Sequence, residues 1–259
     1  MDDAPPSIHH LETCPSTMDE ARARAGAGAP SGSVVWANHQ SAGRGRVAHR
    51  LWRACRGESL LFTLILRYES AAAFPAALPL RAALALADAI AALFPPLAPA
   101  IAVKWPNDLM LNGKKAAGIL TESDGTSVFI GMGVNVLQEA PETLDEGGRA
   151  TSILAELRNA QSPVVPNVEA LLEETLPRLK AELSGGAAQA DDRDWRPRLE
   201  SILHMKGREV LFLNGRADGA CEVRGALVGV SDEGFLLMRD GATGTQRAFV
   251  AGELSLRQA

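Results

Sequence analysis

The sequence contains few cysteines and no excess of basic residues. Its three cysteines, Cys14, Cys55 and Cys221, are odd in number and form no C-x-x-C pair, which argues against both a disulfide framework and a zinc site. The formal net charge is −5, so the chain as a whole lacks the basic excess that non-specific nucleic-acid binding needs. The composition fits a reducing cytoplasm, and we expect no nucleic-acid partner.

The sequence also has no uninterrupted apolar run long enough to predict a membrane span. The apolar stretch 82–103 contains Asp88, Pro95, Pro96 and Pro99, and proline breaks the interior of a helix. The first ten residues carry two acids and two prolines, where a secretion signal has a basic start and an apolar core. We therefore expect a cytoplasmic protein with no membrane partner.

What remains is the profile of a globular protein. The 259 residues are 46% hydrophobic and 22% charged, enough for one large domain or for one large and one small domain. Apolar patterns predict strands and helices that alternate irregularly, as in a mixed α/β layer. Strands are expected at 7–14, 33–40, 59–67, 101–105, 109–112, 114–123 and 127–136, and helices at 16–28, 78–94, 167–183 and 193–203.

Local signals refine these segments. The spacing of Thr17 and Glu20 predicts a capping box at the start of the first helix. Asn-Gly at 112–113 and Ser-Asp-Gly-Thr at 123–126 are hairpin signals. The patterns at 167–183 and 193–203 each contain one proline, which is expected to kink or restart the helix. From Gly207 onward, short strands separated by glycine-containing turns indicate a small barrel or sandwich.

Two polar stretches carry chemistry. The sequence "GRGR" at 43–46 brings flexible backbone amides and two guanidinium groups onto one loop, which suits a phosphate or acyl-phosphate oxygen. Alone, such a loop is ordinarily a solvated basic surface. Lys104, Asn107 and Asp108 precede a turn that Lys114 and Lys115 follow, and a surface turn is ordinarily polar for solvation alone.

The sequence "GMGVN" at 131–135 places two glycines on one face of an expected strand. Because glycine weakens a strand, such a pair usually marks a place where another group approaches the backbone closely. The combination of this strand, the basic loop and the polar turn is harder to explain by solvation than any one of them.

Taken together, these stretches resemble the biotin protein ligase family. The matching segments follow the family's order along nearly the whole chain, and the Lys-Trp-Pro-Asn-Asp stretch at 104–108 is highly specific. They are "STMDEA" (16–21), "HQSAGRGR" (39–46), Trp52, "VKWPNDLMLNGKKAAGIL" (103–120), "IGMGVNV" (130–136) and "GELSLR" (252–257).

The resemblance implies an α+β fold with two domains. Residues 1–204 would form a biotin- and ATP-binding catalytic domain, a mixed sheet with flanking helices related to class II aminoacyl-tRNA synthetases and lipoate ligases. Residues 205–259 would form a small SH3-like β-barrel. Only about a dozen residues precede "STMDEA", too few for the helix-turn-helix of the family's operator-binding members, so we expect the monofunctional type without a DNA-binding domain.

The resemblance also implies two reactions. Biotin and ATP, with Mg²⁺, would give biotinyl-5′-adenylate and pyrophosphate. The biotinyl group would then pass to one lysine of a biotin carboxyl carrier domain of acetyl-CoA carboxylase or a related carboxylase. The protein is expected to be a monomer or weak homodimer. A lipoate or octanoate ligase remains an alternative because the fold is shared, although the Arg-Gly loop and the Lys-Trp-Pro-Asn-Asp stretch favour biotin.

The family match assigns roles residue by residue. The expected catalytic residues are Lys115, Asp108, Arg44 and Arg46. The expected biotin-binding residues are Ser16, Thr17, Gln40, Arg44, Gly45, Arg46, Lys115 and Gly118. The expected ATP-binding residues are Arg44, Arg46, Trp52, Asn107, Lys115, Gly131, Gly133, Asn135 and Arg257, and Asp108 is the expected magnesium ligand.

Several of these roles have open alternatives. Asp108 suits a general base, an electrostatic guide for the incoming lysine or a metal ligand. Ser16 and Thr17 are equally good helix N-caps, and both roles can hold at once. Lys114 is assigned to solvent, because neighbouring residues of an extended strand point to opposite faces.

The chain departs from the family at two places. Met18 stands where some relatives have asparagine, and it is left out of the expected site. Residues 47–51, "VAHRL", replace the second Arg-Gly pair that is common in relatives, so closure of this loop is the least certain of the expected features.

Overall fold

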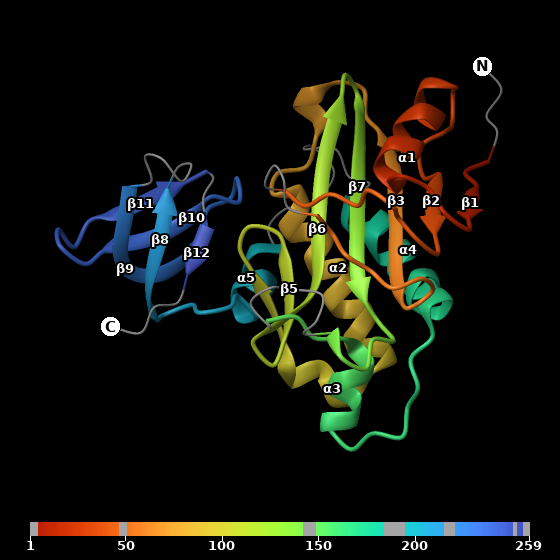
Figure 1. Cartoon of the computed structure of the whole chain (residues 1–259). Coiled ribbons are helices and arrows are strands. Elements are labelled where there is room, and N and C mark those ends of the chain that lie inside the picture. Colours follow the sequence, from red (N-terminus) through yellow and green to blue (C-terminus); the bar gives the residue numbers. More distant parts are fainter. Residues whose placement is uncertain are drawn as a thin grey trace.

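The computed structural model describes residues 5–46, 51–141, 149–183, 195–214, 221–250 and 253–255. Its larger part is a seven-stranded sheet with the strand order β1-β2-β3-β7-β6-β5-β4 (Figure 1). In this sheet β1 and β2 are parallel and every other pair of neighbours is antiparallel. The strands are β1 (Ile8–Leu11), β2 (Val34–Ala37), β3 (Ser59–Arg67), β4 (Ile101–Lys104), β5 (Asp108–Leu111), β6 (Lys114–Asp124) and β7 (Ser127–Asn135).

The smaller part is a five-stranded antiparallel sheet in the order β11-β10-β9-β8-β12. Its strands are β8 (Glu209–Asn214), β9 (Cys221–Val230), β10 (Leu236–Asp240), β11 (Gln246–Phe249) and β12 (Glu253–Ser255). The helices are α1 (Thr17–Gly26), α2 (Leu78–Leu93), α3 (Ile153–Asn159), α4 (Val168–Leu183) and α5 (Trp195–Ser201), with short 3-10 turns at Ala71–Ala73 and Pro95–Ala100. The expected α+β class and the separate C-terminal β-structure are confirmed.

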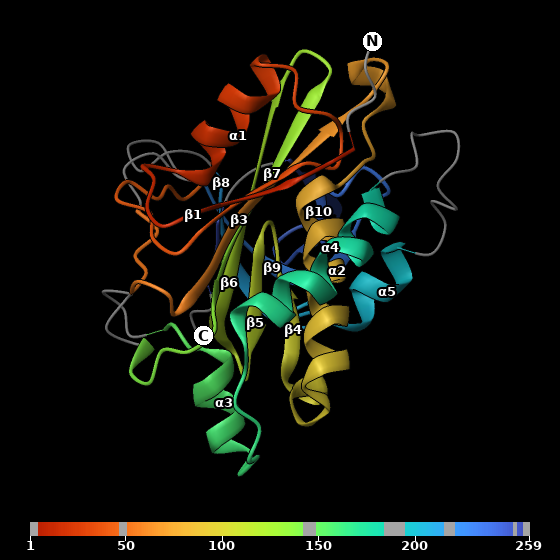
Figure 2. The same cartoon turned by 90° about the vertical axis from the view of Figure 1, so that its right-hand side faces the viewer.

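The central strands of the large sheet are covered on both faces, which explains their unbroken apolar sequences. Along β3, Phe62 and Leu64 belong to the main core with α2 and α4, whereas Ile65 packs with Met18 of α1 and with Phe129 of β7. Figure 2 shows α1 on one side of the sheet and α2 and α4 on the other. The face that α1 covers is called the α1 face below.

The hairpin between β5 and β6 forms where the sequence predicts it. Asn112 and Gly113 have φ angles of 48° and 75°, the left-handed conformations that a two-residue hairpin turn needs. The turn after Asp124 likewise has Gly125 at a φ of 59°. Among the described residues, no helix is long and apolar enough to span a membrane.

The predicted capping box was wrong, and of the two alternatives for Pro177 the restart is excluded. The N-cap of α1 is Ser16, whose side chain accepts a hydrogen bond from the Met18 backbone N–H, so Thr17 is the first helical residue and the predicted capping box does not form. Pro177 does not restart α4, which runs unbroken from Val168 to Leu183. Pro197 lies in the first turn of α5, where proline disturbs a helix least.

The two sheets share one core around Trp105. This side chain is 2% exposed, its Nε1 donates to the carbonyl oxygen of Gly234 at 3.0 Å, and its ring lies edge-on to Phe212 of β8 at 6.0 Å between centroids. A Cβ built on Gly234 would lie 2.6 Å from the Cβ of Ala77. The small sheet therefore packs closely against the large part. The predicted domain boundary at 204/205 lies between α5 and β8 and stays a prediction.

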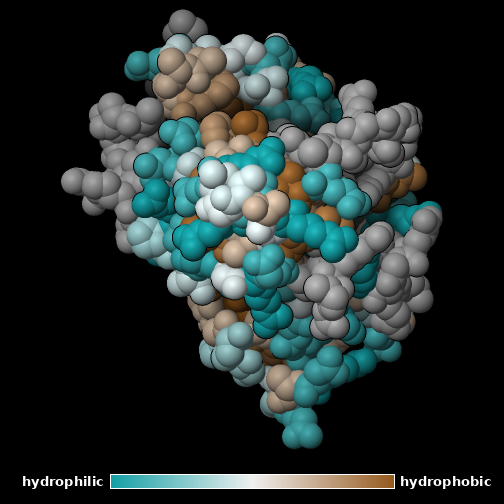
Figure 3. Space-filling model, turned by 90° about the vertical axis from the view of Figure 1, so that its left-hand side faces the viewer, coloured by the Kyte–Doolittle hydropathy of each residue, from teal (hydrophilic) through white to brown (hydrophobic). Residues whose placement is uncertain are grey.

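Figure 3 faces the small sheet and shows a mixture of hydrophilic residues and smaller apolar patches. The large apolar side chains of this sheet, including Phe212 and Leu227, belong instead to the core it shares with the rest of the protein. Burial of its inner face thus holds the small sheet to the large part of the protein.

We expect Gly234→Ala to destabilise the protein by roughly 2–4 kcal/mol, because alanine at a positive φ is strained and its methyl group overlaps Ala77. Gly125→Ala is the matched control: it also has a positive φ, but nothing lies within 4 Å of its built Cβ. Urea denaturation measures both variants. Equal losses of unfolding free energy would show that the contact between the two sheets is not tight.

Candidate functional site

A pocket opens on the α1 face of the large sheet and gathers most of the predicted site residues. Its empty space, open mouth included, is about 530 Å³. The predicted residues that line it are Ser16, Thr17, Gln40, Arg44, Gly45, Arg46, Trp52, Asn107, Lys115, Gly118, Gly131 and Gly133. These residues are spread over more than a hundred positions of sequence, so the fold and not local sequence brings them together.

One end of the pocket is a buried hydrogen-bond network. The backbone N–H of Thr17 donates to Gln40 Oε1 at 2.7 Å, and the Thr17 hydroxyl donates to the same oxygen at 3.1 Å. The hydroxyl of Thr63 on β3 donates to Thr17 Oγ1 at 2.9 Å. Ser16 is 3% exposed and caps α1. It therefore acts as the N-cap of the helix and lines the pocket at the same time.

The floor of the pocket is bare backbone. Gly118 of β6 pairs directly with Gly133 of β7, and the indole of Trp52 lies on both. A Cβ built on Gly133 would be 2.5 Å from the Trp52 ring, and one built on Gly118 would be 3.1 Å from it. Any side chain at these positions would displace the ring. Gly133, one of the two glycines that the sequence places on one strand face, and Gly118 of the neighbouring strand therefore form a flat surface that accepts a planar group.

Lys115 reaches the same face through a β-bulge. Asp108 pairs with Gly118 and Met110 with Lys115, and the register shifts between these pairs so that Ala116 is an extra residue. In a regular strand Lys115 and Gly118 would point to opposite faces. The bulge turns Lys115 to the α1 face, and its Nζ lies 3.4 Å from the Cβ position built on Gly118.

The Lys115 ammonium is held by a carboxylate and an aromatic ring. Its Nζ lies 2.7 Å from Asp108 Oδ1 and 5.6 Å from the centroid of the Trp52 ring. The Lys115 backbone N–H donates to the Arg149 carbonyl, and its carbonyl accepts from the Thr151 N–H, both at 2.8 Å. Lys115 is thus fixed at both its backbone and its charged end.

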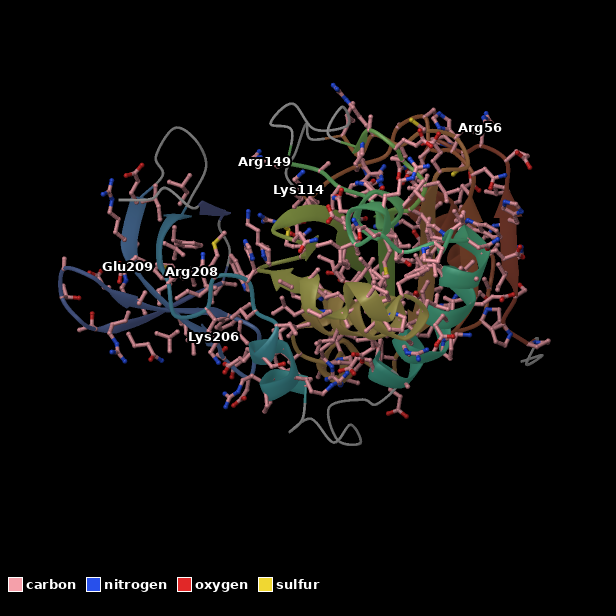
Figure 4. All side chains as sticks on the ribbon, turned by 90° about the horizontal axis from the view of Figure 1, so that it is seen from below. Arg56, Lys114, Arg149, Lys206, Arg208 and Glu209 are labelled. Atoms are coloured by element: carbon pink, nitrogen blue, oxygen red, sulfur yellow. The ribbon has the colours of Figure 1, made fainter. Side chains whose placement is uncertain are left out.

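Lys114 is exposed, as predicted. It does not line the pocket, and Figure 4 labels it near Arg149, at the start of β6. The two neighbouring lysines therefore occupy different environments, which makes them a natural pair for comparison.

Arg44 is anchored to α1. Its two terminal nitrogens donate to the two carboxylate oxygens of Asp19 at 2.6 and 2.7 Å, a bidentate geometry specific to arginine. This hydrogen bond holds the pKa of the Asp19 carboxyl below its ordinary value and raises the pKa of the Arg44 guanidinium. Arg44 also forms an isolated β-bridge with Leu51, which closes the loop that starts at Gly43.

Two predicted residues that the structure describes, Asp108 and Asn135, lie outside the pocket lining. Asp108 contacts the site through its ion pair with Lys115. Asn135 is 3% exposed; its Nδ2 donates to the Thr151 carbonyl, and its buried Oδ1 has no hydrogen-bond partner among the residues that the structure describes. Arg257 lies outside the described residues.

Sequence reasoning missed several residues that line the pocket: Met18, Thr63, Ile119, Leu120 and Met132. Met18, which was left out of the expected site, lines the pocket, and its Cε lies 2.8 Å from the Cβ position built on Gly131, so that it fills the space that this glycine leaves. Thr63 had a signal, since it is the polar residue inside the apolar run "LLFTLIL" at 60–66.

The donor set does not fit a metal ion held by the protein. The described residues contain no group of three or more His, Cys, Asp or Glu side chains placed to bind a metal. Two carboxylates beside the pocket, Asp108 and Asp19, are already paired with Lys115 and Arg44. A divalent cation would therefore have to arrive with its own ligands, as magnesium does when it is bound to nucleotide phosphates.

Comparison with known proteins gives consistent matches. Residues 12–136 match the profile of the biotin/lipoate A/B protein ligase family. The chain is 37% identical over 225 residues to the biotin--[acetyl-CoA-carboxylase] ligase of Paracoccus denitrificans, covering 83% of this chain and 88% of that protein. It is 40% identical over 138 residues to the bifunctional ligase/repressor BirA of Bacillus spizizenii, where the match covers 51% of this chain and 41% of BirA. The match therefore spans less than half the length of that relative.

Solved structures agree over nearly the whole chain. The biotin protein ligase of Aquifex aeolicus in complex with biotin and ATP aligns with a TM-score of 0.77 and 25% identity, covering 98% of this chain and 99% of that one. The biotin protein ligase of Leishmania major in complex with biotinyl-5-AMP aligns with a TM-score of 0.64 and 25% identity, covering 96% and 100%.

We expect Asp19→Asn to loosen the Arg44 loop, because it removes the charge that holds the guanidinium. Tryptic cleavage after Arg44 and Arg46 should become faster, by up to about fivefold for a partly exposed pair. The pKa of Asp19 lies below its ordinary value, so its carboxylate is ionised at the neutral pH of the digestion. Glu12→Gln, which alters the exposed Arg56–Glu12 pair, is the control. Unchanged cleavage in Asp19→Asn would show that other contacts hold the loop.

Proposed function

Since the chain belongs to the biotin protein ligase family, we propose that it activates biotin with ATP and transfers the biotinyl group to a lysine of a carrier protein. The observation that carries this proposal is the pocket itself. It combines a polar, hydrogen-bonded end, a flat glycine floor and cationic side chains in one cavity, the three environments that a polar ring system, an adenine and a row of phosphates require.

The first reaction joins two anions. A carboxylate oxygen of biotin attacks the α-phosphorus of ATP, the bond to pyrophosphate breaks, and biotinyl-5′-adenylate forms. Fixed positive charge lowers the barrier because negative charge accumulates between the reactants in the transition state. Lys115 supplies such a charge beside the floor, and Arg44 and Arg46 supply more from the loop that lines the same pocket.

The second reaction needs a deprotonated amine. The carrier lysine attacks the acyl carbon of the adenylate, AMP leaves with the electron pair of the carbon–oxygen bond, and an amide forms. Asp108 lies next to Lys115, so its carboxylate is placed to attract the incoming ammonium and to accept its proton. Of the roles left open for Asp108, these two are the ones that we propose.

The nucleotide would lie on the glycine floor. Trp52 rests there now, and an indole that packs on a flat backbone surface can equally pack on a base inserted beneath it. Asn135 Oδ1 is a buried acceptor that no described residue meets with a hydrogen bond, and it is suited to the amino group of adenine. Asn107 and Arg257 complete the proposed ATP contacts, and magnesium would enter as the complex with ATP.

The loop at 43–46 would keep the adenylate from water. A mixed acyl-phosphate anhydride hydrolyses readily, and glycine-rich loops that close over such intermediates are common. The partner we propose is the biotin carboxyl carrier domain of acetyl-CoA carboxylase or a related carboxylase, in line with the activity that names the Paracoccus relative. Lipoate or octanoate transfer is the competing substrate assignment within the same family profile.

We expect Lys115→Ala to slow adenylate formation by roughly 10²-fold or more, the usual loss when one contact to developing charge is removed. Single-turnover assays with labelled biotin, ATP, Mg²⁺ and a biotin carrier domain measure this rate. Lys114→Ala is the matched control and should be mild, because Lys114 is exposed and outside the pocket.

The same assay separates the alternatives. Transfer of lipoate in place of biotin would replace the substrate assignment, and binding to operator DNA in a parallel arm would add a repressor activity. Near-wild-type adenylate formation by Lys115→Ala would contradict the role of this lysine.

A further inference from the structure

Thr63 is a buried polar residue in the centre of the large sheet. It lies on β3, is 0% exposed and pairs with Val35 of β2 and Gly131 of β7. Its Oγ1 lies 3.6 Å from the Cβ position built on Gly131, so it stands directly beside the pocket floor. If Thr63 served only the sheet, its hydroxyl would need no hydrogen-bond partner outside the strand. Instead, the hydroxyl donates to Thr17 of α1.

The direction of the hydrogen bonds at this end of the pocket follows from proton counting. The backbone N–H of Thr17 can only donate, so the Gln40 atom that it meets at 2.7 Å must be the amide oxygen. The single hydroxyl proton of Thr17 is directed to the same oxygen at 3.1 Å. The oxygen of Thr17 is then left to accept, and Thr63 is the residue that donates to it at 2.9 Å.

The hydrogen bonds from Thr63 to Thr17 and from Thr17 to Gln40 link a strand, a helix end and a loop. Gln40 follows the end of β2 in a loop held by an isolated bridge to Cys14, and Thr17 is the first residue of α1. Thr63, in contrast, lies in a strand that is hydrogen-bonded to neighbours on both edges. The hydroxyl of Thr63 therefore ties a loop and a helix end, which both line the pocket, to a strand that is paired on both edges.

We propose that Thr63 is a positioning residue for the head-group end of the pocket. Its hydroxyl fixes the rotamer and proton of Thr17, and through Thr17 it fixes the orientation of the Gln40 amide before any ligand arrives. The identity of the ligand, biotin, rests on the proposed function. The positioning itself does not, because it is a property of the ligand-free network.

Thr63→Val tests the proposal because valine has nearly the same shape and lacks only the hydroxyl. Thr63→Ser keeps the hydroxyl and should rescue any effect. Thr175→Val is the matched control: Thr175 is also 0% exposed, but its hydroxyl donates to the Leu171 carbonyl within α4 and is not part of the pocket lining.

The first readout needs no ligand. The side-chain amide resonance of Gln40, observed by ¹⁵N–¹H correlation spectroscopy, should shift in Thr63→Val, stay near its wild-type position in Thr63→Ser and be unaffected in Thr175→Val. An unchanged Gln40 resonance in Thr63→Val would overturn the proposal.

The second readout is biotin binding by calorimetry, together with the kinetics of adenylate formation. Loss of one neutral hydrogen bond in the network should weaken biotin binding by about three- to tenfold, with the KM for ATP and the kcat at saturating biotin unchanged. Unchanged biotin affinity, or a parallel loss in all three parameters and in Tm, would overturn the positioning role. Wild-type protein that binds no biotin would contradict the proposed function, and the Gln40 resonance would still decide the role of Thr63.

Discussion

The site depends on one extra residue in a strand, the bulge at Ala116 in β6. Without it, strict alternation would place Lys115 on the face covered by α2 and α4, where Ala117 belongs to the core. With it, Ala116 and Ala117 are both buried, and Lys115 and Gly118 both line the pocket. A lysine thus stands beside bare backbone, and every proposed step of the chemistry takes place around that juxtaposition. Bulges of this kind commonly re-aim a side chain next to an active site.

The sequence predicted those parts of the site that depend on local rules or on the family match. The hairpin at Asn112 and Gly113 follows from turn chemistry, and the paired glycines of β7 follow from their poor fit to a strand. Most residues assigned through the biotin protein ligase resemblance line one pocket. The bulge could not be predicted in this way, because register is set by pairing with β5 and β7 across the sheet.

Other features could not be predicted either, because they depend on contacts between segments that are far apart in the sequence. Met18 and Gly131 are 113 positions apart in sequence, and only the packing of α1 on the sheet shows that the methionine fills the space above the glycine. The Arg44–Asp19 pair joins a loop to a helix. Trp105 lies in a core that includes Phe212 of the small sheet, and no sequence pattern indicates that the two sheets share it. Because Trp105 precedes the turn that carries Asn107 and Asp108, packing in the small sheet also fixes part of the site.

The pairing of the cations bears on how the pocket accepts a polyanion. Arg44 is held by Asp19 and Lys115 by Asp108, so neither charge is a bare cation. Both pairs are partly exposed, with Arg44 and Asp19 at 39% and 47% and Lys115 and Asp108 at 37% and 22%. Pairs in such positions contribute only about 0–1 kcal/mol, so exchanging a carboxylate for a phosphate oxygen costs little. The carboxylates therefore hold the two cations in place without competing strongly for them. A ligand that brings several negative charges into the pocket gains more interaction free energy from each cation than is lost when the carboxylate pair is broken.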